Sequence, residues 1–340
     1  MNKQTALVIC PGRGTYNKDE LGYLQRYHAD KTEFIASVDK IRCEQGQKPI
    51  SELDGADKFI AGTHMTGDNA SALIYACAYA DFLSIDRDKY DVVAVTGNSM
   101  GWYIALACAG AANAEDAAKI VNTMGTLMHQ NASGGQVLYT YVDENWMPIP
   151  GKRDELFHLL EEIEGLHLSI ELGGMIVFAG TDNALDALMK KLPPLQNRFP
   201  MRLMYHGAFH TELMTPIAKQ GQAALGLDLF SQPNIHMIDG RGHIWSPYST
   251  DKTSLRDYTL DIQVCETYHF TRAVQVAMKE FVPDKIIVPG PGTTLGGAVA
   301  QSLLEINWQG MRTKEDFSAR QKEDPLILSM GMEEQRKRVV

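Results

Sequence analysis

Short apolar runs alternate with longer helical patterns along this chain. Three of the runs end at turns rich in glycine or proline, and they cover residues 6–10 before PGRG, 92–95 before TGNSMG and 286–288 before PGPG. Apolar runs of this length, separated by helices, are typical of parallel strands buried on both faces of a sheet. Alanine- and leucine-rich segments predict helices that flank the sheet over residues 69–83, 101–109 and 114–129. The expected fold class is therefore α/β with a parallel sheet.

The pattern changes between residues 135 and 204. It predicts a strand, a helix, two strands, a helix and a strand, over residues 136–142, 154–163, 166–172, 175–179, 183–191 and 201–205. This βαββαβ order is the ferredoxin-like arrangement. We therefore expect a large α/β domain from residues 1–134 and 206–308, with a ferredoxin-like subdomain inserted at 135–205. After Trp308 the chain becomes polar and charged, and residues 309–340 are expected to form a surface tail with little core of its own.

Charge and cysteine content exclude several classes of protein. The 340 residues include 42 acidic and 32 basic side chains, and the net charge of −10 disfavours a nucleic-acid partner. The five cysteines are scattered without a CxxC pair, which indicates a reducing compartment. The apolar run at the N-terminus is too short for a signal peptide or a membrane span. We expect a cytoplasmic protein with no membrane partner.

The sharpest chemical signal is the GxSxG run from Gly97 to Gly101, at the junction of a predicted strand and a predicted helix. Small residues permit the tight turn that exposes a nucleophilic serine, here Ser99, and the following helix directs N–H groups toward an oxyanion. Such a serine needs a base. His210 stands out among ten histidines, because it lies where the chain returns from the insertion to the large domain. The residues alone leave open a purely structural role for this histidine.

Five sequence blocks carry a family resemblance. They are PGRGT, GNSMGWYIALACAG, MGTLMHQ, GAFHTELM and PGPGTTLGG. Over roughly residues 5–305 the chain resembles the malonyl-CoA:acyl carrier protein transacylases and the acyltransferase domains of polyketide and fatty acid synthases. The resemblance implies an α/β-hydrolase-like large domain with an inserted ferredoxin-like subdomain. It also implies acyl-CoA and phosphopantetheine thioesters as substrates and an acyl carrier protein as partner.

The resemblance implies roles for individual residues as well. Ser99 matches the family nucleophile and His210 its general base, and the backbone carbonyl of Gln263 would orient the histidine in place of a carboxylate. The backbone N–H groups of Met100 and Arg13 would form the oxyanion hole. His210 would take the proton of Ser99 as the serine attacks a thioester, and a second thiol would release the acyl group in a ping-pong reaction.

The chain departs from the family where a free carboxylate would bind. A gapless alignment from Ser99 places Met124 on the arginine that pairs with the malonyl carboxylate in the family. Because a buried carboxylate without a charged partner is costly, malonyl is expected to be a poor substrate and a monocarboxylic acyl group a better one. The expected acyl pocket comprises Met124, Trp102 and Phe209, although Trp102 could instead only pack against the subdomain. Arg13 replaces the usual glutamine, and its side chain is expected to face solvent rather than supply a cation to the pocket.

Two other functions stay open. An acyl-thioester hydrolase on the same scaffold would release the acyl group to water, and a non-catalytic carrier-binding subunit would keep only the fold. The intact Ser99, His210 and Gln263 argue against the second of these. No metal site is expected, since His206 lies near His210 without a third ligand nearby in sequence. No bound cofactor is expected either, because the chain lacks a GxGxxG or GxxxxGK fingerprint.

Overall fold

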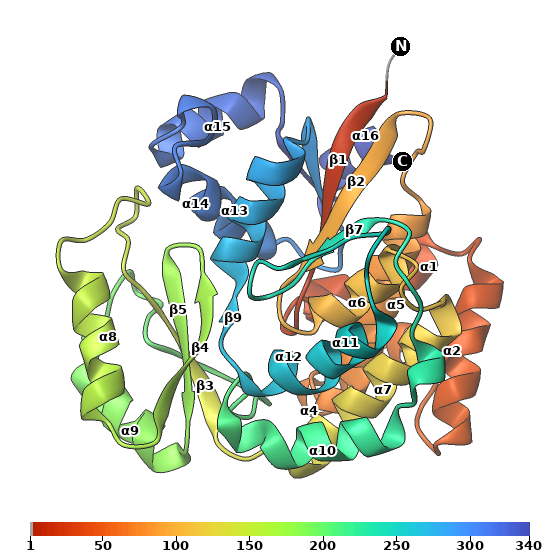
Figure 1. Cartoon of the computed structure of the whole chain (residues 1–340), viewed down its shortest axis with the longest axis horizontal. Coiled ribbons are helices and arrows are strands. Elements are labelled where there is room, and N and C mark those ends of the chain that lie inside the picture. Colours follow the sequence, from red (N-terminus) through yellow and green to blue (C-terminus); the bar gives the residue numbers. More distant parts are fainter. Residues whose placement is uncertain (1–2) are drawn as a thin grey trace.

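Six strands form the central sheet of the large domain in this computed structural model, which describes residues 3–340 (Figure 1). In spatial order they are β11 (Ile327–Ser329), β10 (Lys285–Val288), β1 (Gln4–Cys10), β2 (Tyr90–Gly97), β7 (His236–Ile238) and β8 (Ile244–Trp245). Neighbouring strands run parallel except β7 and β8, which are antiparallel. The α/β fold class that the apolar runs predicted is confirmed.

Helices cover both faces of this sheet. Along β1, Ala6 and Val8 pack into one hydrophobic core, whereas Leu7 and Ile9 pack into another, because successive side chains of a strand point to opposite faces. The first face is covered by α5 (Gly67–Leu83), α6 (Gly101–Cys108) and α7 (Ala114–Asn131). The second is covered by α13 (Phe270–Phe281) and α14 (Leu295–Glu305) (Figure 1). This double cover explains why β1 is apolar and buried at every position from Ala6 to Cys10.

The remaining helices of the large domain are shorter or lie at its periphery. They are α1 (Tyr23–Tyr27), α2 (Thr32–Glu44), α3 (Ile50–Asp54), α4 (Ala61–His64), α10 (Thr215–Ala224), α11 (Lys252–Asp257), α12 (Gln263–Cys265), α15 (Lys314–Glu323) and α16 (Glu333–Val339). One turn of π-helix, Tyr258–Ile262, joins α11 to α12. Turns of this kind recur at functional sites, and this one directly precedes Gln263.

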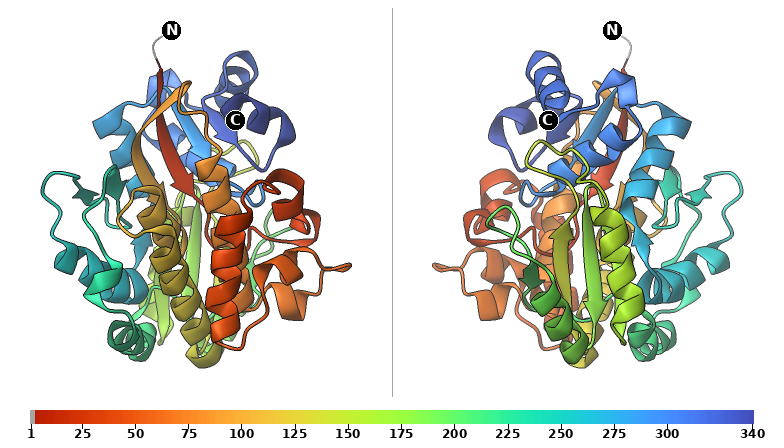
Figure 2. Two further views of the ribbon diagram at one scale, coloured as in Figure 1. Left: turned by 90° about the vertical axis from the view of Figure 1, so that its right-hand side faces the viewer. Right: turned by 90° about the vertical axis from the view of Figure 1, so that its left-hand side faces the viewer.

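The insertion folds as a second sheet with two helices. Its elements follow in the order β3 (Gly135–Thr140), α8 (Lys152–Glu162), β4 (Leu166–Leu172), β5 (Met175–Gly180), α9 (Asp182–Lys191) and β6 (Met201–Leu203). Both helices lie on one face of the sheet (Figure 2). The spatial order is β6–β3–β5–β4–β9, and β9 (Tyr268–His269) comes from the large domain and runs parallel to β4. A strand of two residues has no recognisable pattern, and the sequence did not predict it.

The C-terminal segment corrects the expectation of a surface tail. Strand β11 extends the central sheet beside β10, and Leu326, Leu328 and Met330 are buried with it. Helix α15, by contrast, is polar and has no buried residue. The short apolar run at 326–330 stands between charged segments, so its burial depends on the open edge of β10 and not on a pattern of its own.

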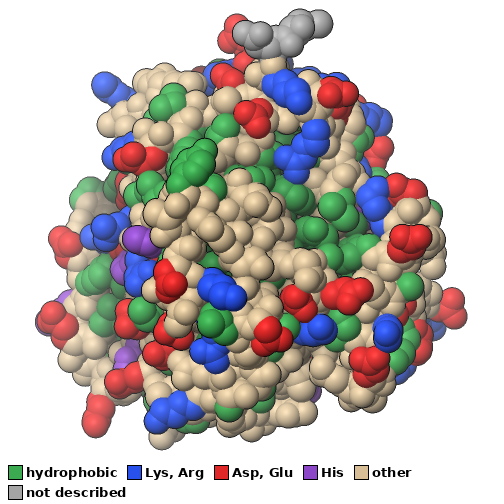
Figure 3. Space-filling view, turned by 45° about the vertical axis from the view of Figure 1, so that its right-hand side comes forward, with side chains coloured by type: hydrophobic (Ala, Val, Ile, Leu, Met, Phe, Trp, Pro, Cys, Tyr) green, Lys and Arg blue, Asp and Glu red, His purple; other side chains and the backbone are tan. Residues whose placement is uncertain are grey.

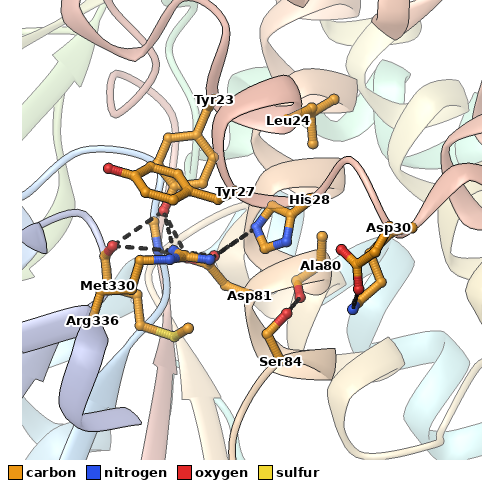
Figure 4. Close-up of polar contacts among 12 residues, drawn as sticks. Tyr23, Leu24, Tyr27, His28, Asp30, Ala80, Asp81, Ser84, Met330 and Arg336 are labelled. Carbon is orange, nitrogen blue, oxygen red and sulfur yellow. Dashed lines mark hydrogen bonds and ion pairs between the residues drawn. The ribbon is translucent and has the colours of Figure 1, made fainter. Parts of the chain in front are cut away.

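Helix α16 is anchored by a buried ion pair. Arg336 donates to Asp81 of α5 over 2.6 Å, and His28 and the hydroxyl of Tyr23 bond the same carboxylate at 2.8 Å each (Figure 4). The backbone N–H of Gly290 is a fourth donor at 2.7 Å. A buried carboxylate surrounded by donors in this way is strongly dependent on each partner. The cluster ties α16 to α1, α5 and the PGPG loop.

The surface carries both signs of charge. On the face that Figure 3 shows, lysine and arginine side chains are interspersed with aspartate and glutamate rather than gathered into one basic field. No helix within residues 3–340 is both long enough and apolar enough to span a membrane.

Candidate active site

Ser99 lies on the sharp turn between β2 and α6. Its backbone is left-handed, with a φ of 54°, which a residue with a side chain rarely adopts. The two glycines of the GxSxG run are required by space: a Cβ on Gly97 would lie 2.3 Å from the carbonyl of Gly101, and one on Gly101 would lie 2.4 Å from the carbonyl oxygen of Cys10. The turn therefore packs backbone on backbone and leaves the serine side chain at its tip.

His210 meets this serine although the two residues are 111 positions apart. The distance from Oγ of Ser99 to Nε2 of His210 is 2.7 Å, and the other ring nitrogen, Nδ1, lies 2.7 Å from the backbone carbonyl oxygen of Gln263. A carbonyl can only accept, so Nδ1 carries a proton and Nε2 is left as the acceptor for the serine hydroxyl. The histidine is thus held in the tautomer that a general base requires.

The side chain of Gln263 holds the backbone of the serine turn. Its Nε2 donates to the backbone carbonyl of Ser99 over 3.0 Å, and its Oε1 accepts from the hydroxyl of Tyr103 over 2.8 Å. One residue therefore contacts the histidine through its main chain and the serine turn through its amide. The sequence did not indicate Tyr103, whose position one turn along α6 from Ser99 is the only signal available.

Two backbone N–H groups beside the serine have no partner in the described part of the chain. They belong to Met100, just before the first residue of α6, and to Arg13, in the loop after β1. The loop approaches the serine turn closely, since a Cβ on Gly12 would lie 2.6 Å from the carbonyl oxygen of Asn98. Unpaired N–H groups at a helix N-terminus next to a nucleophile are suited to stabilising an oxyanion.

Burial sets the charge of His210. The side chain is 4% exposed, and its desolvation lowers the pKa of the imidazole from 6.5 to about 4, opposed in part by the hydrogen bond to Gln263. The ring is therefore neutral at physiological pH and able to accept a proton.

A small cavity opens beside Ser99. Residues from α5, α6, α7 and the loops around the serine surround it: Arg13, Ser71, Ser99, Met100, Tyr103, Val121, Met124, Gly125, Met128, Phe209, His210, Gln263 and Val264. Met124 and Phe209 thus lie in the wall of the cavity where an acyl group would sit. Its floor is closed where α5 and α7 come together, because a Cβ on Gly125 would lie 2.8 Å from the side chain of Ser71.

Trp102 does not line this cavity, contrary to the expectation from sequence. Its side chain is fully buried on the other side of α6, where Nε1 donates to the hydroxyl of Thr259 over 2.9 Å and the ring packs edge-on against Tyr258. Trp102 follows Ser99 by three positions along α6, and its side chain faces the π-turn instead of the cavity. Trp102 supports the segment that leads to Gln263.

The side chain of Arg13 is half-buried rather than free in solvent. Its Nη2 donates to the backbone carbonyls of Met65 and Tyr205, and the residue is one of those that border the cavity. His206 forms a hydrogen bond from Nδ1 to Oε1 of Gln136 at 2.6 Å. Among residues 3–340 no group of three His, Cys, Asp or Glu side chains is placed to hold a metal ion.

A second, wider groove also reaches His210. It runs between the subdomain and the large domain, and its walls include His167 and Leu168 of β4, Thr211, Glu212, Arg241 and Glu266. His210 is common to the groove and to the cavity. A long flexible substrate lying in the groove would therefore present its end at the serine.

Comparison with known proteins points to one family. No family model matches the chain. Malonyl CoA-acyl carrier protein transacylase of Staphylococcus aureus strain MRSA252 is 25% identical over 228 residues, which cover 65% of this chain and 70% of the relative. The crystal structure of malonyl-CoA:ACP transacylase from Synechocystis sp. PCC 6803 superimposes with a TM-score of 0.75 at 17% identity, covering 98% of this chain and 99% of that one.

A further solved structure is a complex. A malonyl-transacylase bound to a type II polyketide synthase acyl carrier protein superimposes with a TM-score of 0.72 at 18% identity, covering 88% of this chain and 93% of that one. At this level of identity the structures establish the fold, and the curated relatives carry the same name as the structural neighbours. The family that the five sequence blocks indicated is thereby confirmed: the curated relatives and structural neighbours of this chain are malonyl-CoA:acyl carrier protein transacylases.

Proposed function

We propose that this chain is an acyltransferase that moves an acyl group from a coenzyme A or carrier-protein thioester to a pantetheine thiol, through an ester on Ser99. The observation that carries the proposal is the continuous series of hydrogen bonds from Ser99 through His210 to the carbonyl of Gln263, each 2.7 Å long. The names of the curated relatives and of the structural neighbours support it.

The chemistry follows from these contacts. Nε2 of His210 takes the hydroxyl proton as Oγ of Ser99 attacks the thioester carbonyl, and the negative oxygen is met by the N–H groups of Met100 and Arg13. The tetrahedral intermediate collapses, the thiolate leaves with the proton from His210, and the acyl-serine ester remains. A second thiol then gives its proton to the same nitrogen, attacks the ester and carries the acyl group away, which regenerates the serine.

The two openings suit this sequence of events. The cavity borders Ser99, where an acyl group would be attached, and the groove between the two domains offers a path for a pantetheine arm to His210. One structural neighbour is a transacylase in complex with an acyl carrier protein. We infer that a carrier protein is the partner of this chain as well, its arm entering along the groove.

The acyl group that fits this cavity depends on Met124 and Arg13 together. The expectation of a monocarboxylic group rested on Met124, which does lie in the cavity wall and leaves α7 without a cation there. Arg13 is among the residues that border the same cavity. Met124 alone therefore gives no reason to exclude malonyl, and the preference for a monocarboxylic group is not supported.

Intact-protein mass spectrometry tests the proposal. Incubation with malonyl-CoA or acetyl-CoA is expected to add one acyl mass to the protein and none to the Ser99→Ala variant. Addition of a pantetheinylated carrier protein should transfer that mass to the carrier. Free acid without acyl-carrier product would identify a thioester hydrolase instead, and the absence of any adduct would identify a protein that keeps only the fold.

A further inference from the structure

A separate pocket lies at the edge of the central sheet opposite to Ser99. Its walls come from the amino ends of β1, β2 and β10 and from the C-terminal segment: Gln4, Lys89, Tyr90, Lys285, Asp324, Pro325, Leu328 and Arg338. Because these strands run parallel, their amino ends share one edge of the sheet, whereas Ser99 follows the carboxyl end of β2. The eight residues of β2 span roughly 25 Å at about 3.3 Å per residue. The pocket is therefore distinct from the cavity and the groove that reach His210.

Cations dominate the wall of this pocket. Three of its eight residues are lysine or arginine and one is aspartate, although acidic residues outnumber basic ones by 42 to 32 in the whole chain. The aspartate, Asp324, is already shared between two cations: Oδ1 contacts Nζ of Lys285, and Oδ2 lies 3.0 Å from Nη1 of Arg320. The local charge balance is thus the reverse of that of the chain, and it favours an anion.

Lys285 is the most deeply buried of the three cations. It is 5% exposed, and its Nζ donates to Oδ1 of Asp324 and, over 2.9 Å, to the backbone carbonyl oxygen of Pro325. Both partners border the pocket, so the ammonium group lies at the pocket wall. An ammonium group has three N–H donors, and the third has no acceptor among residues 3–340. A buried lysine with a donor to spare is suited to a ligand that accepts hydrogen bonds.

The other two cations flank the hydroxyl of Tyr90, which donates to the backbone carbonyl oxygen of Arg338 over 3.1 Å. Burial raises the pKa of this phenol, and the charges of Lys89 and Arg338 oppose the rise, so both charged groups lie near it. The guanidinium of Arg338 forms no hydrogen bond or ion pair within residues 3–340. Nζ of Lys89 contacts Asp86 at 3.1 Å and the carbonyl oxygen of Val340 at 3.2 Å, and half of that side chain is exposed. Both cations are therefore available to a ligand.

We propose that this pocket is a second ligand site, and that it binds a phosphate group, either free or carried by a small molecule. A phosphate presents several strong acceptor oxygens, which allows Lys89, Lys285 and Arg338 to bind it together. The pocket has a volume of about 350 Å³, and Pro325 and Leu328 supply apolar wall for the rest of a small phosphate monoester. The inference does not depend on the acyltransferase function proposed above.

A ligand in this pocket links α16 to the sheet. Figure 1 shows α16 beside the amino ends of β1 and β2. Arg338 lies on this helix two residues after Arg336, which donates to Asp81. Asp81 also accepts from the backbone N–H of Gly290 in the PGPG loop. Because a phosphate held by both Arg338 and Lys285 connects the helix to β10, its binding should make local opening of α16 less frequent.

Isothermal calorimetry on the full chain tests the site. Inorganic phosphate and glycerol 3-phosphate are the two probes, acetate is the comparison anion, and sodium chloride keeps the ionic strength equal throughout. The variant Lys89→Gln/Arg338→Gln removes two of the three cations. The matched control is Lys48→Gln/Lys337→Gln, which loses the same charge from two exposed side chains, one of them on α16.

The wild-type protein and the control should bind at least one phosphate probe with equal affinity, and the Lys89→Gln/Arg338→Gln variant should bind it at least about tenfold more weakly. Tighter binding of glycerol 3-phosphate than of inorganic phosphate would identify a phosphate monoester as the ligand, whereas equal affinity would identify the free ion. Absence of binding by both probes, an affinity that the variant retains, or equally tight binding of acetate would overturn the inference.

Hydrogen exchange supplies a test that needs no variant. Saturating phosphate should slow exchange of the backbone amides of α16 in the wild-type protein relative to chloride at the same ionic strength. The amides of α10, on the opposite side of the molecule from α16, serve as the internal control (Figure 1). Unchanged exchange in α16, or equal slowing in both helices, would refute a phosphate site between α16 and the sheet.

Discussion

Ser99 and His210 share a left-handed backbone conformation, with φ of 54° and 58°, and their side chains meet at 2.7 Å. Residues with side chains adopt this conformation at a cost, so the surrounding structure must impose it. At Ser99 the close packing of two glycines does so, and at His210 the backbone N–H is held by the carbonyl of Val264 at 3.1 Å. The contact between the proposed nucleophile and the proposed base is therefore built into two constrained loops before any substrate arrives.

The first prediction concerns the serine turn. Gly97→Ala would place a Cβ 2.3 Å from the carbonyl of Gly101, and we expect a loss of about 1–3 kcal/mol in the free energy of unfolding together with loss of acylation. Gly296→Ala in α14 is the control, because nothing lies within 4 Å of its added Cβ. Urea unfolding of both variants tests this. Equal stability of the two would show that the turn has more room than the structure indicates.

The second prediction separates the main chain of Gln263 from its side chain. Gln263→Ala keeps the carbonyl that orients His210 but loses the bonds to Ser99 and Tyr103. We expect acylation to slow by about tenfold, whereas His210→Ala should slow it by about 10²–10⁴-fold because the general base is gone. Rapid-quench measurement of the first acylation compares them. A Gln263→Ala variant as slow as His210→Ala would mean that the amide, and not the carbonyl, holds the base.

The third prediction is a pH profile. Because burial lowers the pKa of His210 to about 4, the imidazole stays neutral through the weakly acidic range, and the acylation rate should be level above pH about 5 and fall below it. The unfolded chain binds a proton at this residue more tightly than the folded chain does. The contribution of His210 to stability should therefore decline as the pH drops from 6.5 toward 4. A kinetic step near the ordinary histidine pKa would contradict the burial of the base.

The fourth prediction addresses the anchor of α16. Asp81→Asn leaves Arg336 buried without its counter-charge, and we expect a loss of about 3–5 kcal/mol in the free energy of unfolding. Lys337→Met removes an exposed pair with Glu334 on the same helix and should leave stability nearly unchanged. Chemical denaturation of the two variants provides the measurement. Similar effects from both would show that the cluster at Asp81 is not what holds the C-terminal segment.

Local patterns predicted the parts of the fold that depend on local sequence. The apolar runs at β1, β2 and β10 and the alternation of strands and helices in the insertion are of this kind. Strands β9 and β11 are too short to carry a period, and each forms only because a sheet edge built elsewhere accepts it. The charged C-terminal sequence therefore gave no indication of strand β11 or of the burial of Arg336.

In the site, too, local sequence predicted some features, whereas others depend on contacts between distant residues. The GxSxG turn made Ser99 a candidate nucleophile by its own chemistry, but the roles suggested for His210 and Gln263 needed the family resemblance, since nothing in their spacing shows that they meet. The side chain of Trp102 was placed wrongly because side-chain direction depends on neighbours that are distant in sequence: Nε1 of Trp102 donates to the hydroxyl of Thr259, on the side of α6 that faces away from the cavity.

The most direct test of the covalent mechanism is to locate the acyl group. The protein is mixed with malonyl-CoA or acetyl-CoA, quenched in acid within seconds, digested and sequenced by tandem mass spectrometry. The mechanism predicts that the acyl mass lies on Ser99 and that it disappears when a pantetheine thiol is added before the quench. An acyl group found on another residue, or a Ser99→Ala protein that still transfers acyl groups to the thiol at the wild-type rate, would contradict it.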